Sequence, residues 1–279
     1  FRFRISATTS LGLNGSHDVI AAVTPDYTGP DFQHEVNIDM YVLQPSVSFA
    51  ASDDLNVEVR LPLRRLVRRA KVIAPPSTSP GDLGNMENHL NRHHRSATLT
   101  GIGDLQIEMH SPESRQWRWG FSLPTGHTEP NPYEGNGNHE HVQFGTGTVV
   151  PRGMYAWAED NYMMSTSVSL PVYANRHGFT PPPELTFYAG VRNEFSSKWR
   201  WSLGSSMRVQ GYGDWSGERD VNTGYAALLA DIALTNVTDN GSWHYGVMIP
   251  LAQELFSDGS DMFEFGTTFA VTFSPVWGD

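Results

Sequence analysis

The sequence predicts an all-β fold, an antiparallel transmembrane β-barrel of about 12 strands that forms one domain over residues 1–279. Three observations predict it. Apolar residues alternate with small or polar ones in many segments, the links between these segments are alternately short and long, and most tryptophans lie beside the short links. We therefore expect short periplasmic turns and long extracellular loops.

The alternation is clearest in residues 263–273. The odd positions carry large apolar side chains apart from Thr267, and the even positions carry small or polar residues and Glu264. Successive side chains of a strand point to opposite faces, so this segment has one apolar face and one polar face. It is also as long as the roughly 9–11 residues with which a strand crosses a membrane.

Similar segments recur along the chain, and residues 223–235 fit either register. The expected strands span residues 1–10, 36–51, 54–73, 97–110, 116–125, 142–157, 162–175, 184–195, 199–213, 223–235, 243–252 and 262–275. The long links between them are residues 11–35, 74–96, 126–141, 176–183, 214–222 and 253–261. An even number of strands with this asymmetry is typical of outer-membrane barrels.

The positions of the tryptophans favour a membrane location independently of the alternation. The tryptophans beside the proposed short turns or the C-terminus are Trp117, Trp119, Trp157, Trp199, Trp201, Trp243 and Trp277, whereas Trp215 lies in a long link. Indole side chains collect at membrane interfaces, so these residues are a candidate aromatic girdle. The alternative is a tryptophan-rich core in a soluble sandwich.

Composition narrows the classes of function. The chain has a formal net charge of −11 and no cysteine, which argues against a nucleic-acid partner and a thiolate metal site. No window approaches the roughly 18 apolar residues of a spanning helix, and no sustained helical periodicity suggests a parallel α/β fold. We expect a protein of the bacterial outer membrane, with membrane lipid, lipopolysaccharide and a small-molecule solute as partners.

Charges of both signs fall on the expected lumen face. The candidate lumen or constriction residues are Asp39, Glu58, Arg60, Asp104, Glu108, Arg118, Arg192, Glu194, Arg200, Arg208, Asp231 and Glu264. Such groups can simply pair with one another to satisfy the inner wall, or a subset can bind or conduct a solute. Both interpretations stay open at this point.

A basic run lies on the upper half of the third expected strand. Its members Arg64, Arg65, Arg68 and Arg69 cannot all face the lumen, and an arginine facing the middle of the lipid layer costs about 2–4 kcal/mol. We therefore expect them at the outer headgroup level, where they contact lipopolysaccharide phosphates. The alternative is a solvated loop base.

Histidines concentrate in the expected outer loops. The spacings of His89, His93 and His94, and of His139 and His141, can bring imidazoles onto one divalent metal ion. The alternative is a solvated, pH-sensitive loop surface.

Enzyme motifs such as Gly-x-Ser-x-Gly are absent from the sequence. A hydrolase set at the barrel rim could be assembled from Ser96, His94 and Asp82, but no spacing singles these residues out. We expect no enzyme and no cofactor apart from the loop metal.

Three glycine-rich stretches carry a family resemblance. Residues 101–105 read Gly-Ile-Gly-Asp-Leu, residues 123–126 read Leu-Pro-Thr-Gly, and residues 144–147 read Phe-Gly-Thr-Gly. Their order resembles the meta-pathway phenol-degradation protein family, which implies a transporter-like outer-membrane barrel for small hydrophobic or aromatic compounds. Asp104 is expected to pair with Arg118 in a structural role.

The most favoured function is thus an outer-membrane channel for passage or capture of small molecules. The second hypothesis is a non-conducting surface barrel whose histidine-rich loops bind metal or a partner protein. The third is the rim-active lipid hydrolase.

Overall fold

Twelve antiparallel strands close into a barrel in the computed structural model, as the sequence predicts. The structure describes residues 2–22, 24, 27–111, 117–131, 143–220, 223–256 and 262–275. The barrel wall is built in chain order from β1 (Arg2–Val19), β2 (Phe32–Ser52), β3 (Leu55–Arg60) with β4 (Leu63–Ile73), β5 (Ala97–Ile102) with β6 (Leu105–His110), β7 (Trp117–Leu123), β8 (Val150–Glu159), β9 (Tyr162–Ser169), β11 (Glu184–Ser196), β12 (Trp199–Gln210), β15 (Tyr225–Thr238), β16 (Gly241–Leu255) and β17 (Met262–Glu264) with β18 (Thr267–Pro275).

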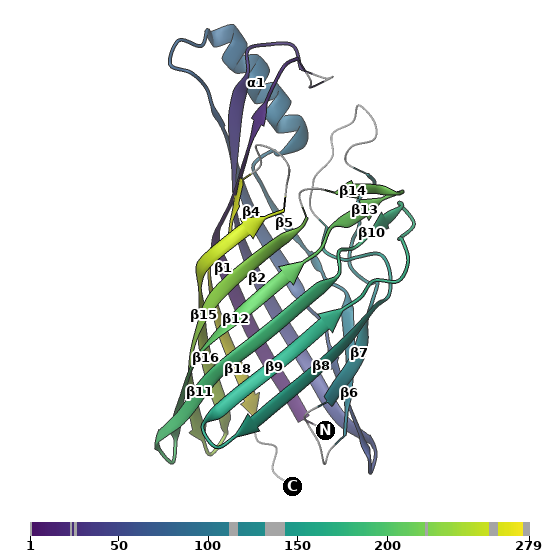
Figure 1. Cartoon of the computed structure of the whole chain (residues 1–279), viewed down its shortest axis with the longest axis vertical. Helices are drawn as coiled ribbons and strands as arrows, with labels where there is room; N and C mark the ends of the chain where they lie inside the picture. Colours follow the sequence, from purple (N-terminus) through teal and green to yellow (C-terminus); the bar gives the residue numbers. More distant parts are fainter. Residues whose placement is uncertain are drawn as a thin grey trace.

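The first and last strands close the barrel. β1 pairs with β18, where Ile5 lies opposite Phe273, and with β2, where Ile5 lies opposite Pro45. The described wall strands are therefore hydrogen-bonded to their neighbours around the ring, except along the second edge of β5 (Figure 1). Closure removes the free edges that an open sheet would present, which is the condition for a sheet to span a membrane.

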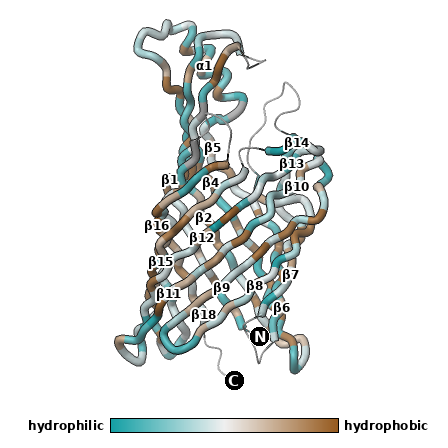
Figure 2. The backbone as a smooth tube through the Cα atoms, viewed as in Figure 1, coloured by the Kyte–Doolittle hydropathy of each residue, from teal (hydrophilic) through white to brown (hydrophobic). Residues whose placement is uncertain are grey.

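The outer face of the wall is apolar. Leu203 of β12 lies opposite Val191 of β11 and Ile232 of β15, and Leu203 and Ile232 are among the most exposed apolar side chains. Their neighbours on the inner face, such as Ser202 and Ala233, are small. Figure 2 shows hydrophobic stretches recurring around the wall. This pattern confirms the expected alternation.

The two ends of the barrel differ. Short turns such as the one between β8 and β9 lie at the end where β1 begins and β18 finishes (Figure 1). Trp117 begins β7, Trp199 begins β12, and Trp157 and Trp243 also lie within three residues of a short link. The expected girdle therefore lies at one end, although Trp277 falls outside the described residues.

Three strands and a helix rise beyond the other end of the wall. The upper parts of β1, β2 and β4 extend above the rim, and the helix α1 (Pro80–His93) lies against them (Figure 1). Val19, Tyr27, Phe32 and Met86 form the core of this extension, and burial raises the pKa of the Tyr27 phenol. The links expected over residues 11–35 and 74–96 are thus largely regular structure. No described helix is long and apolar enough to cross a membrane.

A small sheet lies over the rim on the side of β7 to β9. β10 (Phe179–Thr180), β13 (Gly213–Trp215) and β14 (Glu218–Asp220) form it. The rings of Phe179 and Trp215 pack with centroids 4.6 Å apart. The expected links over residues 176–183 and 214–222 therefore also contain strand.

Two neighbouring strands of the wall are interrupted at the same height. Residues 61–62 separate β3 from β4, and residues 103–104 separate β5 from β6. β6 pairs with β3 and β7, whereas β5 pairs with β4 alone in the part of the chain that the structure describes. The next expected strand, residues 142–157, begins only at Val150.

The register of residues 223–235 is ambiguous in the sequence for a physical reason. The pairing of β15 with β16 shifts between Leu228 and Leu229.

The apolar outer face generates a prediction for protein folded into lipid vesicles. Leu203→Arg should lower the free energy of unfolding by about 2–4 kcal/mol, because its cation faces the middle of the lipid layer. Ser202→Arg, on the adjacent inner position, is the matched control and should cost much less. Urea unfolding followed by tryptophan fluorescence measures both, and equal losses would contradict the assignment of the faces.

Candidate functional site: the lumen and its inner segment

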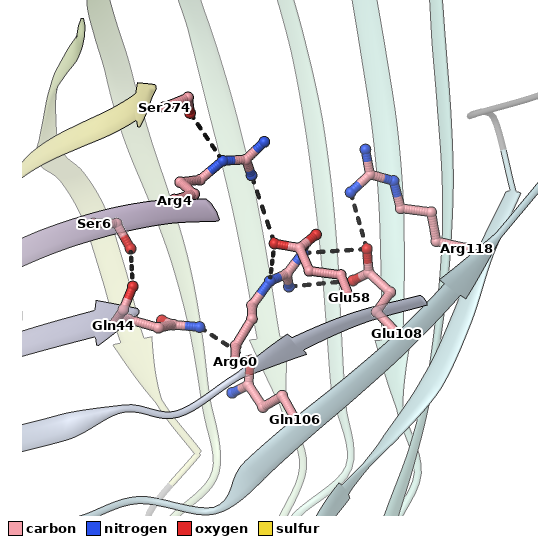
Figure 3. A network of polar contacts seen from close by, with 9 residues as sticks. All are labelled: Arg4, Ser6, Gln44, Glu58, Arg60, Gln106, Glu108, Arg118 and Ser274. Carbon is pink, nitrogen blue, oxygen red and sulfur yellow. Dashed lines mark hydrogen bonds and ion pairs between the residues drawn. The ribbon is translucent and has the colours of Figure 1, made fainter. Parts of the chain in front are cut away.

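A network of ion pairs occupies the lower lumen, nearer the short turns. The Arg60 guanidinium lies 2.8 Å from Glu58 and 3.2 Å from Glu108, and Arg118 lies 2.9 Å from the same Glu108. Arg4 approaches Glu58 at 3.7 Å and donates to the Ser274 hydroxyl at 3.1 Å. Figure 3 shows these side chains reaching toward one another from separate strands.

Strand register places this network. Glu58 of β3 lies directly opposite Glu108 of β6, a cross-strand pair of like charges that is unfavourable by itself. The Arg60 side chain bonds to both carboxylates and removes the repulsion. Because the Glu58 side chain is only 8% exposed, loss of Arg60 would leave this buried charge with only the longer contact to Arg4, which is costlier than breaking a surface pair.

An apolar cluster lies on the inner face of the upper wall, between the inward-facing Arg64 and Arg68. The ring of Phe144 is 8% exposed and packs with Leu66 of β4, and Ile38 and Leu99 pack against this pair. The Phe144 carbonyl accepts a hydrogen bond of 3.0 Å from Arg64. The described residues between β7 and β8, 124–131 and 143–149, are called the inner segment here. This inner segment contributes an aromatic side chain to the inner faces of β2, β4 and β5.

Asp104 fixes this inner segment at the strand interruption. One carboxylate oxygen accepts from the Gly126 amide at 3.0 Å, and the other accepts from the amide and the hydroxyl of Thr146 at 2.7 and 2.6 Å. The Thr125 hydroxyl accepts from the Leu105 amide and donates to the Gly103 carbonyl. The interrupted backbone is therefore bridged by side chains instead of a neighbouring strand.

The glycines of the three sequence stretches lie at close contacts around Asp104. A Cβ atom on Gly145 would lie 2.4 Å from an Asp104 oxygen and 2.6 Å from the Cα of Gly126. A Cβ atom on Gly101 would lie 2.7 Å from the Phe144 ring. The stretches that carry the family resemblance therefore meet at one place, where only glycine leaves room.

A cavity of about 190 Å³ lies beside the network and borders strands from β3 to β11. Its charged lining residues are Arg60, Glu108, Arg118, Arg152 and Glu184. Arg152 was not among the candidates from the sequence. It is two residues after Val150 in β8, so both side chains lie on the same face, and this spacing could have placed Arg152 on the inner face. Phe144 was missed because it was assigned to a strand. The glycines that follow it, Gly145 and Gly147, were the signal against a strand at this position.

The predicted lumen residues fall into separate groups. Glu58, Arg60, Glu108 and Arg118 meet in the network. Arg208 and Asp231 lie on the inner face further round, where Arg208 approaches the Met248 sulfur at 4.0 Å and Asp231 lies opposite Gly204.

Three others lie near the short turns. Arg200 pairs with Glu194 at 2.7 Å, and both side chains are more than half exposed. Arg192 is exposed and lies beside the Asp160 carbonyl. A role for these residues in a constriction stays a prediction.

Three expectations about acidic lumen residues are wrong. Asp104 binds the inner segment, and Arg118 pairs with Glu108 instead. Asp39 shares its strand face with the exposed Tyr41, so it points to the outer face and not to the lumen. Glu264 lies opposite Asn14 of β1, and strand register carries this face through Asn37 to the outward Arg69, so Glu264 also points to the outer face.

The arginine run is divided between the two faces of β4. Arg65 and Arg69 are exposed on the outer face, where Arg69 pairs with Asp39 at 2.9 Å. Arg64 and Arg68 face inward, and Arg68 is 3% exposed and donates to the Arg95 carbonyl. The expected contact with lipopolysaccharide is therefore wrong for Arg64 and Arg68 because they face inward, and it stays a prediction for Arg65 and Arg69.

The predicted histidine sites are only partly described. His89 is buried beside the Tyr27 and Phe32 rings, and the His94 ring lies 4.8 Å from the His34 ring. His93 belongs to α1, and His139 and His141 lie outside the described residues. Within the described ranges no three ligating side chains form a metal site, and metal binding stays a prediction.

The hydrolase set is not brought together. Asp82 and His94 lie at opposite ends of α1, about 18 Å apart at 1.5 Å per residue. The Ser96 hydroxyl bonds to the backbone of Ala70, and the Asp82 carboxylate accepts from Ser79. These positions do not form a nucleophile, base and acid in contact.

Comparison with known proteins supports the fold. No family model and no curated protein matches the sequence. An outer-membrane channel from Pseudomonas putida F1 is 10% identical, with 98% of this chain and 94% of that chain covered and a TM-score of 0.56. The P. putida toluene transporter TodX is 6% identical, with 100% of this chain and 91% of that chain covered and a TM-score of 0.46. The Ralstonia pickettii toluene transporter TbuX is 10% identical, with 98% of this chain and 90% of that chain covered and a TM-score of 0.42.

The likeness to the first structure identifies the class of fold, a closed barrel of the outer-membrane type. The lower TM-scores of the two toluene transporters carry no further argument. The resemblance to the meta-pathway phenol-degradation family is not confirmed and stays a prediction.

The role of Asp104 generates a testable prediction. Asp104→Asn replaces one accepting oxygen by an amide nitrogen, which cannot accept from Gly126 or Thr146. A buried donor without a partner costs about 1–3 kcal/mol, so the free energy of unfolding in urea should fall by that amount. Asp53→Asn, in an exposed short turn, is the control, and equal stabilities of the two variants would refute the role.

Proposed function

We propose that this chain is a channel of the bacterial outer membrane that admits small, largely apolar molecules. The observation that carries the proposal is the cluster of Phe144, Leu66, Ile38 and Leu99 inside the upper lumen. Apolar surface inside a pore offers nothing to a hydrated ion or sugar. An apolar solute gains free energy there by leaving water.

The position of β5 supports a route to this cluster. Leu66 of β4 and Leu99 of β5 lie on the inner face of the wall and belong to the cluster. No described strand pairs with the second edge of β5. Gly126 and Thr146 of the inner segment are attached to Asp104, directly after β5. Movement of this segment would open the upper lumen without unpairing a strand ladder.

The second half of the proposed solute route passes through the lower lumen. A solute that leaves the apolar cluster meets the ion pairs of Arg60 with Glu58 and Glu108. These pairs restrict the opening, so passage requires their side chains to move aside. A channel of this kind would conduct ions poorly while a small neutral solute passes.

The proposal includes an orientation in the membrane. The short turns face the periplasm, α1 and the long links face the cell exterior, and residues 1–279 act as one barrel domain. The exposed Arg65 and Arg69 would then lie at the outer headgroup level, where guanidinium groups bind lipopolysaccharide phosphates. The apolar outer face and the tryptophans at one end support this placement.

Uptake by whole cells tests the proposal. Gram-negative cells that express the chain should take up radiolabelled toluene, used as a small apolar aromatic probe, several-fold faster than cells with an empty vector. Phe144→Ala should raise the rate further, because removal of this buried ring leaves more space beside Leu66 and Leu99 while the route stays apolar.

Phe195→Ala removes the same ring from an exposed position near a short turn and is the matched control. It should take up toluene at the wild-type rate. Equal uptake with and without the chain, at similar amounts of folded protein, would refute the proposed function.

A further inference from the structure

One arginine on the inner face of the barrel has no partner. Arg152 is the third residue of β8 and lies opposite Gly120 of β7 and Ser169 of β9. Its side chain borders the lumen cavity and is exposed to it. Among the residues that the structure describes, no hydrogen bond or ion pair engages its guanidinium, unlike those of Arg60 and Arg118.

The nearby carboxylates are already engaged or lie further off. Glu108 accepts from Arg60 and Arg118, and Asp104 accepts from Gly126 and Thr146. Glu184 also lies opposite Ser169, from the other side of β9. Its backbone is therefore two strand spacings from that of Arg152, about 9–10 Å.

The electrostatic surroundings add to the positive charge. Arg64 interacts electrostatically with the Asp104 carboxylate and, more weakly, with Arg152, and the buried Nε atom of Arg64 has no hydrogen-bond partner. Of the charged residues that line the cavity, three are arginines and two are glutamates. The cavity thus presents a cation that no described carboxylate pairs with, in register with Glu108 across Gly120 of β7.

Apolar side chains lie close to this cation. Val150 is two residues before Arg152 on the same face of β8, and it is buried. Arg64 donates to the Phe144 carbonyl, so the apolar cluster begins directly beside the arginines. A ligand here would have its apolar body toward Phe144 and a negative group at Arg152.

We propose that Arg152 binds the carboxylate of a small amphiphilic acid, such as an aromatic carboxylate, inside the lumen. A guanidinium binds a carboxylate through two parallel charge-assisted hydrogen bonds. The inference rests on the proposed function and deepens it, because it adds an anionic group to the apolar solutes of the channel.

Equilibrium dialysis tests the site directly. Radiolabelled benzoate is the probe, and the protein is the full chain folded in detergent. Wild-type protein should bind it saturably, and Arg152→Gln should weaken binding about tenfold or more, since a hydrogen bond to a charged group is worth about 1.5–3 kcal/mol. Arg219→Gln is the control, because Arg219 is exposed on β14 over the Tyr212 ring, outside the cavity.

A second variant keeps the test falsifiable if Arg152→Gln folds poorly. Glu184→Gln removes a negative charge from the cavity lining, so benzoate binding should become tighter. No binding of benzoate by folded wild-type protein, or equal binding by the Arg152→Gln and Arg219→Gln proteins, would overturn the inference.

Toluene uptake by the wild-type chain is measured in parallel. Uptake of toluene without binding of benzoate would refute the anion site and leave the proposed function in place. Binding of benzoate without uptake of toluene would refute the proposed function and support the site.

Discussion

The arrangement of the lumen depends on the three hydrogen bonds that the Asp104 carboxylate accepts. They attach the segment between β7 and β8 to the point where β5 ends and β6 begins. A buried carboxylate is tolerated only when donors surround it, and Gly126 and Thr146 supply those donors. The same attachment sets the position of the Phe144 ring, since Gly145 and Thr146 follow it directly.

This constraint divides the lumen into two zones of different chemistry. Above the interruption, Phe144 and Leu66 form an apolar cluster beside the inward-facing Arg64. Below it, inward positions of β3, β6 and β7 carry charges that neutralise one another around Arg60. Arg152 lies in register with Glu108, with no partner in the described chain. A solute that crosses both zones must leave water in one and pass fixed charges in the other.

Period-two alternation predicted the barrel well, because a wall with lipid on one side and a lumen on the other repeats the same contrast in every strand. It also predicted four members of the ion-pair network. The helix α1 was missed since most of its residues are polar, although Ser79, Pro80 and the spacing of Leu83, Met86 and Leu90 signalled it. The contact of Asp104 with Thr146 could not be predicted, because it joins residues 42 positions apart.

The central claim is that apolar molecules occupy the upper lumen beside Phe144. Diffraction from crystals of the protein soaked with bromobenzene tests it most directly, because bromine gives an anomalous signal that locates the ring. We predict a bromine peak inside the barrel, in contact with the Phe144, Leu66 and Leu99 side chains. Bromine found only on the outer wall or in the detergent layer, at full soaking concentration, would contradict the claim.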